Sequence, residues 1–140
     1  MNEPEHLLRV QNRLGETPIW APEENALYWV DWGGLPTCRF EPSTSQFSTF
    51  PTSLPVTALA RRASGGWIAI AQNGIYGWDS NTNVYQPLAG PPKPEKPDIC
   101  FNDAAVDRQG RLLLGTVDMG DPFAPEGSLF RLDTDGSLHE

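Results

Sequence analysis

Residues 63–88 read "ASGGWIAIAQNGIYGWDSNTNVYQPL" and contain two short apolar runs, each bounded by Gly, Asn, Asp or Ser. The runs at 66–72 and 74–79 are rich in β-branched and aromatic side chains, which favour strands. The segment therefore predicts a turn, a strand, a Gly-containing hairpin, a second strand and a polar turn. No stretch of the chain combines a 3.6-residue apolar period with helix caps, so we expect an all-β protein.

The same order of turns and strands occurs three times along the chain. The period is 41 residues and then 44 residues, measured between equivalent apolar positions of the three copies. The three copies and these positions are 23–50 with Leu27, 63–88 with Ile68, and 108–138 with Leu112. A repeat of ~40–50 residues with this content is typical of a four-stranded β-propeller blade. The alternative is an ordinary antiparallel sheet whose spacing is coincidental.

The repeats predict one partial propeller domain over residues 1–140, with blades at roughly 15–55, 56–98 and 99–140. Residues 4–14 then form an outer strand of the blade that closes the ring. A closed ring needs ~4–8 blades, and three repeats leave sheet edges exposed, which predicts self-association. A truncated protein, one product of a split gene and a half-ring that assembles with itself all fit this pattern.

Charge and composition exclude several classes of function. The net charge of −8 leaves no basic surface for nucleic acid or for an anionic membrane. The first residues lack the features of a signal peptide, and no run reaches the ~18 apolar residues of a membrane helix. Cys38 and Cys100 stand alone without CxxC spacing, which favours two free thiols. We therefore expect a cytoplasmic protein.

Three segments resemble the SMP-30/gluconolactonase/regucalcin-like (LRE) family. These segments are "LGETPIW" (14–20) followed by "YWVDW" (28–32), "SGGWIAI" (64–70), and "FNDAAVDRQGRLLLGTVD" (101–118). The resemblance covers nearly all 140 residues in order and corresponds to the N-terminal half of a family member. It implies a six-bladed propeller with one divalent metal ion, calcium, zinc, manganese or magnesium, in the central channel. The implied reaction is hydrolysis of sugar-acid lactones.

The resemblance also implies site residues. Glu16 and Asn102 match two of the four metal ligands, while the second Asn and the Asp that acts as catalytic base lie beyond residue 140, so the catalytic residue is not assigned. The family usually has a substrate-binding Arg where this chain has Cys100, and a thiol lacks the forked, charged donors of Arg. The resemblance places a second substrate contact near Asp118 or at Asp121. Asp103 is expected to orient Asn102 without contacting the metal itself.

Each of these residues also has a plainer interpretation. Glu16 can be a solvated turn residue, or a partner of Arg13 or of a backbone amide. Asn102 and Asp103 can form an Asx turn, and Asp103 can pair with Arg108 or Arg111. The segments "DRQGRL" (107–112) and "DTDGSL" (133–138) lack the full calcium-loop pattern and are expected to be turns in which Gly takes a positive φ.

The function predicted from the sequence is metal-dependent hydrolysis of a sugar lactone. The cation polarises the lactone carbonyl and a carboxylate activates water. Because two of the four ligands are missing from the chain, a monomer is expected to bind metal weakly and to hydrolyse lactones poorly. The alternative is a non-catalytic propeller that binds calcium or another ligand.

Overall fold

The computed structural model describes residues 3–34 and 36–140, and these residues form twelve strands and no helix. The strands pair antiparallel in three separate sheets of four. Sheet 1 consists of β1 (Gly15–Ala21), β2 (Ala26–Asp31), β3 (Thr37–Glu41) and β4 (Gln46–Phe50). Sheet 2 consists of β5 (Val56–Arg61), β6 (Trp67–Ala71), β7 (Gly74–Asp79) and β8 (Val84–Ala89). Sheet 3 consists of β9 (Ile99–Val106), β10 (Leu112–Asp118), β11 (Leu129–Leu132) and β12 (Leu138–His139).

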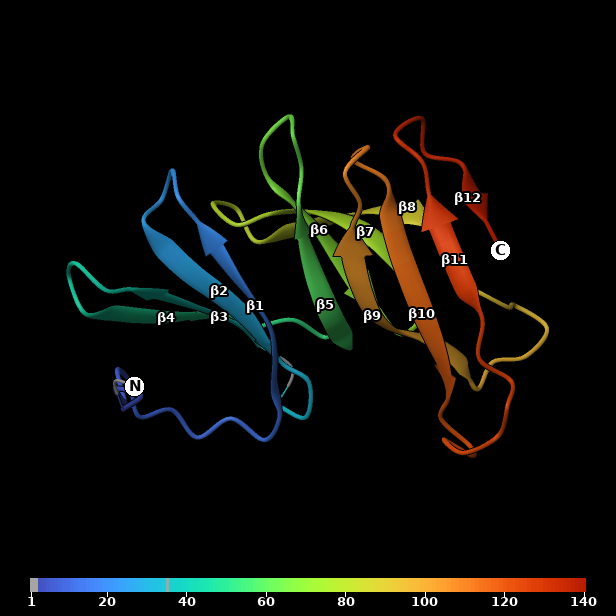
Figure 1. Cartoon of the computed structure of the whole chain (residues 1–140), viewed down its shortest axis with the longest axis horizontal. Helices are drawn as coiled ribbons and strands as arrows, with labels where there is room; N and C mark the ends of the chain where they lie inside the picture. The colour runs from blue at the N-terminus through green and yellow to red at the C-terminus, as the bar shows by residue number, and fades with distance from the viewer. Residues whose placement is uncertain (1–2, 35) are drawn as a thin grey trace.

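The three sheets fan out from their first strands. β5 contacts both β1 and β9, so the first strands of the three sheets lie side by side. The row that these three strands form is the common line of the sheets. Sheet 1 extends to the left of this line and sheet 3 to the right, while β6 to β8 of sheet 2 lie behind (Figure 1). Consecutive four-stranded sheets around a common line are the architecture of neighbouring propeller blades. The prediction of an all-β propeller with about three blades in this chain is confirmed.

Two apolar cores join the sheets. Between sheets 1 and 2, Tyr28 packs on Trp67 with ring centroids 4.4 Å apart, and Trp78 lies against both rings. Between sheets 2 and 3, Phe101 and Phe130 meet edge to face among aliphatic side chains. Because side chains alternate along a strand, β6 supplies Trp67 and Ala69 to the first core and Ile70 to the second. Sheet 2 is therefore covered on both faces.

The outer face of sheet 1 carries a smaller cluster. Trp29, Cys38 and Phe40 are buried there beneath Leu8 and Val10 of the N-terminal segment. Residues 3–14 are not part of a strand, and their backbone joins the sheet where the Trp32 N–H donates to the Leu14 carbonyl. The role of residues 4–14 as the outer strand of a closing blade stays a prediction.

The predicted turns and thiols are confirmed. Gly110 and Gly136 have φ values of 77° and 88° in the turns between β9 and β10 and between β11 and β12. Both cysteines are free thiols. Among the residues described here, no helix could span a membrane. The cytoplasmic location stays a prediction.

Candidate metal and substrate site

All three first strands contain a β-bulge. In β1 the register shifts between Glu16 and Ile19, in β5 between Val56 and Ala58, and in β9 opposite the step from Leu114 to Thr116. A bulge inserts one extra residue, bends the strand and turns side chains away from their regular alternation. The three bulges therefore redirect side chains at the line where the sheets meet.

The bulge in β9 explains the Asn-Asp pair. Phe101 and Ala104 both pack in the core between sheets 2 and 3, although they are three positions apart and regular alternation would put them on opposite faces. Asn102 and Asp103 together lie opposite the single residue Gly115, so the bulge adds one residue to β9, and both side chains are exposed. The Asx-turn interpretation is wrong, because both residues lie inside β9.

The bulge in β1 lies beside Glu16. Thr17 has a φ of 52°, in a left-handed region that β-branched residues rarely adopt. Its hydroxyl donates to the Thr57 carbonyl at 3.4 Å, and the Thr57 hydroxyl donates to the Ile70 carbonyl at 3.3 Å. These bonds connect the bulges of β1 and β5. Unfavourable backbone geometry held by its surroundings is frequent at functional sites.

Glu16 and Asn102 line one cavity although they are far apart in the sequence. The cavity has a volume of about 380 Å³, and its lining residues are Glu16, Thr17, Pro18, Asn102 and Asp103. Glu16 is half-buried and the two β9 residues are exposed. A carboxylate from β1 and an amide and a carboxylate from β9 thus share one polar space beside the common line of the sheets. The structure brings together three of the five predicted site residues.

The other two predicted residues, Cys100 and Asp121, are not among the residues that line this cavity. The Cys100 thiol lies 3.8 Å from the Pro97 carbonyl oxygen, to which it donates. Burial raises the pKa of this thiol, and the carboxylates of Asp98 and Asp118 raise it further. Asp121 is exposed in the connection between β10 and β11, and its carboxylate accepts the Phe123 N–H at 3.1 Å.

Pairings proposed for the acidic residues differ from those observed. Arg111 forms an ion pair with Asp107, with 2.6 Å between Nε and Oδ2, and not with Asp103. The Asp103 carboxylate accepts the N–H of Ala104 at 2.7 Å. Arg13, the suggested partner of Glu16, donates its guanidinium to the Gly33 carbonyl at 3.3 Å.

Sequence reasoning did not assign Thr17, Pro18 or Thr57 to the site. One signal was available, because a proline inside a strand is tolerated at an edge or at a bulge, and Pro18 stands in the middle of β1. Thr57 offers no such signal, since it stands in an ordinary apolar strand sequence.

The donor atoms in the cavity suit a hard divalent cation. Carboxylate and amide oxygens are the preferred ligands of calcium and magnesium. The number of donors is small, however. Within residues 3–34 and 36–140, no group of three or more His, Cys, Asp or Glu side chains is placed to hold a metal ion. Glu16 and Asn102 therefore provide donor atoms of the right chemical type for a cation, but only part of a coordination shell.

The fold and this cavity define a segment of a β-propeller with polar side chains at its centre. The profile of the SMP-30/gluconolactonase/LRE-like region matches residues 14–140, and the chain belongs to this family.

Known proteins of the family show how this chain compares in length. Regucalcin of Xenopus laevis is 33% identical over 132 residues, which are 90% of this chain and 43% of that protein. The pentonolactonase XacC of Haloferax volcanii is 30% identical over 126 residues, 90% of this chain and 41% of the relative. A regucalcin structure from Agrobacterium tumefaciens, described as a calcium-binding protein, superposes with a TM-score of 0.83 at 18% identity over 93% of this chain and 43% of its own. The chain thus spans less than half the length of these relatives.

Proposed function

We propose that this chain contributes to metal-dependent hydrolysis of a sugar lactone. The observation that carries the proposal is the single cavity shared by Glu16 of β1 and Asn102 of β9. The family includes a protein named as a pentonolactonase, which supports a lactone as the substrate class. The whole reaction, its substrate and its metal remain proposals for this chain, because the chain covers less than half of its relatives.

Glu16 and Asn102 would hold the cation, Glu16 through its carboxylate and Asn102 through its amide oxygen. A divalent cation supplies Lewis acidity to a bound carbonyl oxygen. The Thr17 and Thr57 hydrogen bonds fix the strand that carries Glu16, and the bulge in β9 fixes Asn102. Asp103 lines the same cavity, and its carboxylate is held by the Ala104 N–H, so we propose that it positions the Asn102 backbone.

The substrate would enter from the end of the sheets that carries Cys100 and Asp121. Cys100 and Asp121 are both proposed to contact the substrate. Cys100 would place an uncharged thiol where the family usually has Arg. Because its thiol has a raised pKa, Cys100 would offer a weak donor and not a nucleophile.

Acid release from gluconolactone tests this function. The purified chain is assayed in a pH-stat with calcium, zinc, manganese or magnesium, and again after chelation with EDTA. Because the chain provides only part of a coordination shell, we expect a slow rate above the spontaneous background that requires the cation and falls at least about tenfold in Glu16→Gln and in Asn102→Ala. Rates equal to the background with every cation would contradict the proposal.

A calcium-binding protein without catalysis is the second candidate. Cys100 favours it, because the thiol cannot replace the charged donors that a lactone or its acid would need. A relative of this chain is named regucalcin, and a structural neighbour is described as calcium-binding. Calcium binding that depends on Glu16, measured together with a background rate of hydrolysis, would identify this second function.

A further inference from the structure

A groove lies between sheets 2 and 3, at the end of the molecule where the turns after β5, β9 and β11 stand (upper end in Figure 1). Its volume is about 510 Å³, within the ~300–1,000 Å³ of small-ligand sites. The rim consists of charged and hydroxyl side chains of the two turns 61–64 and 133–136. The apolar lining consists of Ala60, Ile68, Leu88, Val106, Leu112 and Leu132.

The strand register explains why side chains do not fill this end of the core. One row of paired residues crosses each sheet here, namely Val106, Leu112 and Leu132 in sheet 3 and Ala60, Ile68 and Gly77 in sheet 2. Gly77 has no side chain to reach toward sheet 3. Instead, Arg62 Nη1 and Leu88 Cδ1 lie 3.6 and 4.0 Å from the point that a Cβ atom would occupy at Gly77. A guanidinium and an apolar side chain therefore lie together at the edge of the groove.

Two apolar side chains of the groove are in contact with water. Leu88 of sheet 2 is 46% exposed and Val106 of sheet 3 is 51% exposed, whereas Leu112 and Leu132 are buried in the core. Exposed apolar side chains that gather in a groove mark a binding site for a ligand or a partner. A ligand that covers Leu88 and Val106 would gain free energy from the burial of their apolar surface.

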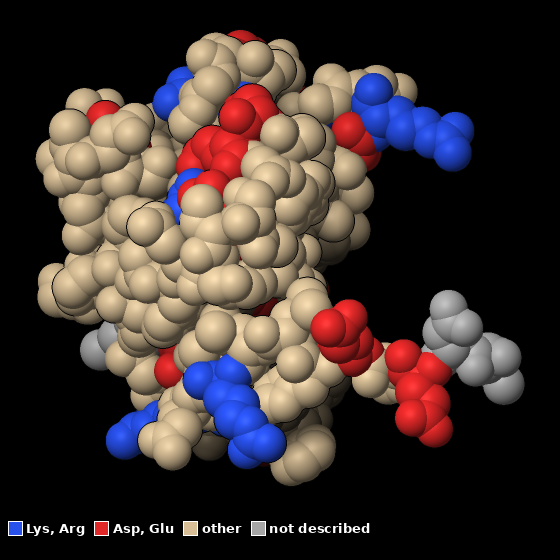
Figure 2. Space-filling view, turned by 90° about the vertical axis from the view of Figure 1, so that its left-hand side faces the viewer, with Lys and Arg blue, Asp and Glu red and all other residues tan. Residues whose placement is uncertain are grey.

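Arg62 adds a positive charge on the sheet 2 wall. Its position is fixed in the turn after β5, where its N–H donates to the Gly66 carbonyl at 3.1 Å. Arg61 pairs with Glu23 and lies over the Trp67 ring, on the opposite face of sheet 2. Acidic and basic side chains likewise lie against each other in the upper half of the sheet 1 side (Figure 2). Within residues 3–34 and 36–140, Arg62 forms no ion pair, so its guanidinium can bind an anionic group.

Asp135 adds a negative charge on the sheet 3 wall. The Ser137 hydroxyl and N–H both donate to its Oδ1, at 2.6 and 2.9 Å. These two bonds hold the pKa of Asp135 below its ordinary value, so the carboxylate is charged at neutral pH. Its Oδ2 is left to accept from a ligand. Asp133 of the same turn is instead bound by the Arg131 guanidinium through bonds of 2.7 and 2.9 Å.

We propose that this groove binds a short apolar peptide whose two ends are free. The terminal carboxylate pairs with Arg62, the terminal ammonium pairs with Asp135, and the apolar side chains cover Leu88 and Val106. Charge complementarity favours this occupant, because a peptide carries one charge of each sign on an apolar body and a fatty acid carries only one charge. A tripeptide is about 10 Å long at ~3.4 Å per residue, which suits a groove of this volume.

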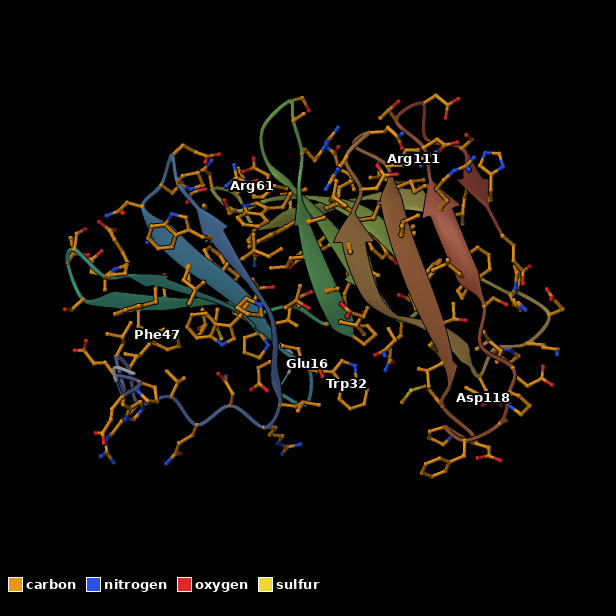
Figure 3. All side chains as sticks on the ribbon, in the orientation of Figure 1. Glu16, Trp32, Phe47, Arg61, Arg111 and Asp118 are labelled. Carbon is orange, nitrogen blue, oxygen red and sulfur yellow. The ribbon has the colours of Figure 1, made fainter. Side chains whose placement is uncertain are left out.

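The groove is separate from the candidate metal site. Arg61, which borders the groove, lies at the upper end of the molecule in Figure 3, and Glu16 lies in the lower half. Glu16 and Asn102 line a different cavity. Peptide binding is therefore a second activity, and it does not depend on hydrolysis of a lactone or on a metal ion.

Titration of the ¹⁵N-labelled chain with Leu-Leu-Leu tests this binding by NMR. We expect a dissociation constant below about 1 mM, which would show specific binding of a ligand of this size. The amide shifts should change most at residues 60–64 and 133–136 and should not change at Glu16 or Asn102.

Two blocked peptides test the two ion pairs separately. A C-terminal amide should weaken binding to the unmodified chain about two- to fivefold, as for a partly exposed ion pair, and should have no effect on binding to Arg62→Gln. N-terminal acetylation should behave in the same way with Asp135→Asn. Arg108→Gln is the control, because Arg108 is exposed at the same end of the molecule and does not line the groove, and it should keep both effects.

A matched pair of variants tests the apolar part of the groove. Leu88→Ser should weaken the binding of all three peptides about three- to tenfold, because it removes apolar surface that the ligand covers. Val84→Ser changes a residue of the same strand that is 49% exposed and does not line the groove, and it should leave the affinities unchanged.

Several results would overturn the proposal. Blocked peptides that bind as tightly as the free tripeptide would do so, as would shift changes confined to other parts of the chain or no change at several millimolar peptide. Octanoate has the apolar body and the carboxylate without the ammonium. Octanoate that binds as tightly as the tripeptide would show that Asp135 does not contribute and that the occupant is a fatty acid. These measurements contain no lactone and no metal, so their failure leaves the proposed function untouched.

Discussion

Asp31 connects the candidate site to the fold at the level of a single residue. The residue is only 5% exposed, and its carboxylate accepts the N–H groups of Arg13 and Leu14, each at 3.0 Å. Burial alone would raise the pKa of Asp31, but the hydrogen bonds from Leu14, Asn12 and Arg13 outweigh burial and hold the pKa below its ordinary value. These bonds fix the chain two residues before Glu16.

Replacing this carboxylate should therefore destabilise the protein. Asp31→Asn removes the charge from a buried set of donors and should lower the free energy of unfolding at pH 7 by about 1–3 kcal/mol. Because the folded-state pKa is lowered, the stabilisation is complete above the unfolded pKa of about 3.9 and is lost as the pH falls through the folded-state value. Urea unfolding between pH 7 and pH 3 measures both effects.

The acid-dependent loss of stability should be smaller in Asp31→Asn than in the unmodified chain. Asp98→Asn serves as the control, since Asp98 is exposed and its replacement should leave the urea midpoint nearly unchanged. Identical pH profiles for the unmodified chain and Asp31→Asn would show that Asp31 does not anchor the segment.

Cys100 gives a second test at the scale of one side chain. Its raised pKa, caused by burial and then by Asp98 and Asp118, keeps the thiol protonated near pH 8. Alkylation by iodoacetamide should be slow at that pH and accelerate at higher pH, because the thiolate is the reacting species. Removing a neighbouring negative charge in Asp118→Asn should lower the pKa and speed alkylation a few-fold at pH 8.

The rate is followed by mass spectrometry of the peptide that contains Cys100. Asp135→Asn, which changes an exposed carboxylate in the turn before β12, is the matched control and should leave the rate unchanged. Rapid alkylation at pH 7 would contradict the assignment of Cys100 as an unreactive neighbour of the site.

At the scale of strands, the sequence predicted the middle of each sheet better than its edges. The apolar runs predicted β2, β6, β7, β10 and β11, because these strands are covered and need Leu, Ile and aromatic side chains. The outermost strands β4 and β8 are largely exposed, so their polar residues give no clear alternation.

The first strands of the sheets were hard to predict from the sequence for a different reason. Pro18, Asn102 and Asp103 are poor strand formers, and they are accommodated only because a bulge relaxes the pairing with the neighbouring strand. A bulge depends on register with a partner, which local sequence does not specify. The meeting of Glu16 with Asn102 was likewise expected from the family resemblance and not from spacing, since it depends on how sheets 1 and 3 stand around sheet 2.

The bulge in β5 gives a prediction about this element. Thr57 is 1% exposed and its hydroxyl donates to the Ile70 carbonyl, while its own carbonyl accepts from Thr17. Thr57→Val keeps the shape and removes the hydroxyl, which should lower the free energy of unfolding by about 1–2 kcal/mol. Urea denaturation measures the change. Thr49→Val, at an exposed position of β4, is the control and should be nearly neutral, and an equal effect of both variants would contradict the role of the hydroxyl.

At the scale of the whole molecule, stability depends on two separate cores. Sheet 1 meets sheet 2 through the core that contains Val30, and sheet 3 meets sheet 2 through the core that contains Leu114. The hydrogen bonds of the ladders stay within each sheet, so packing between sheets does most to hold the sheets in one unit. Each sheet then depends mainly on its neighbour, as repeats do in a linear array.

This arrangement predicts that the losses in the free energy of unfolding caused by substitutions in the two cores are additive. Val30→Ala removes two methyl groups and should cost about 1.5 kcal/mol at about 0.8 kcal/mol for each, and Leu114→Ala should cost about 2–5 kcal/mol. Because sheet 2 separates the two side chains, the double variant should lose the sum of the two costs to within about 0.5 kcal/mol in urea denaturation. A coupling well above that value would mean that sheet 2 repacks as a whole. In that case a substitution on the outer face of sheet 1 or of sheet 3 would also alter the cavity between Glu16 and Asn102.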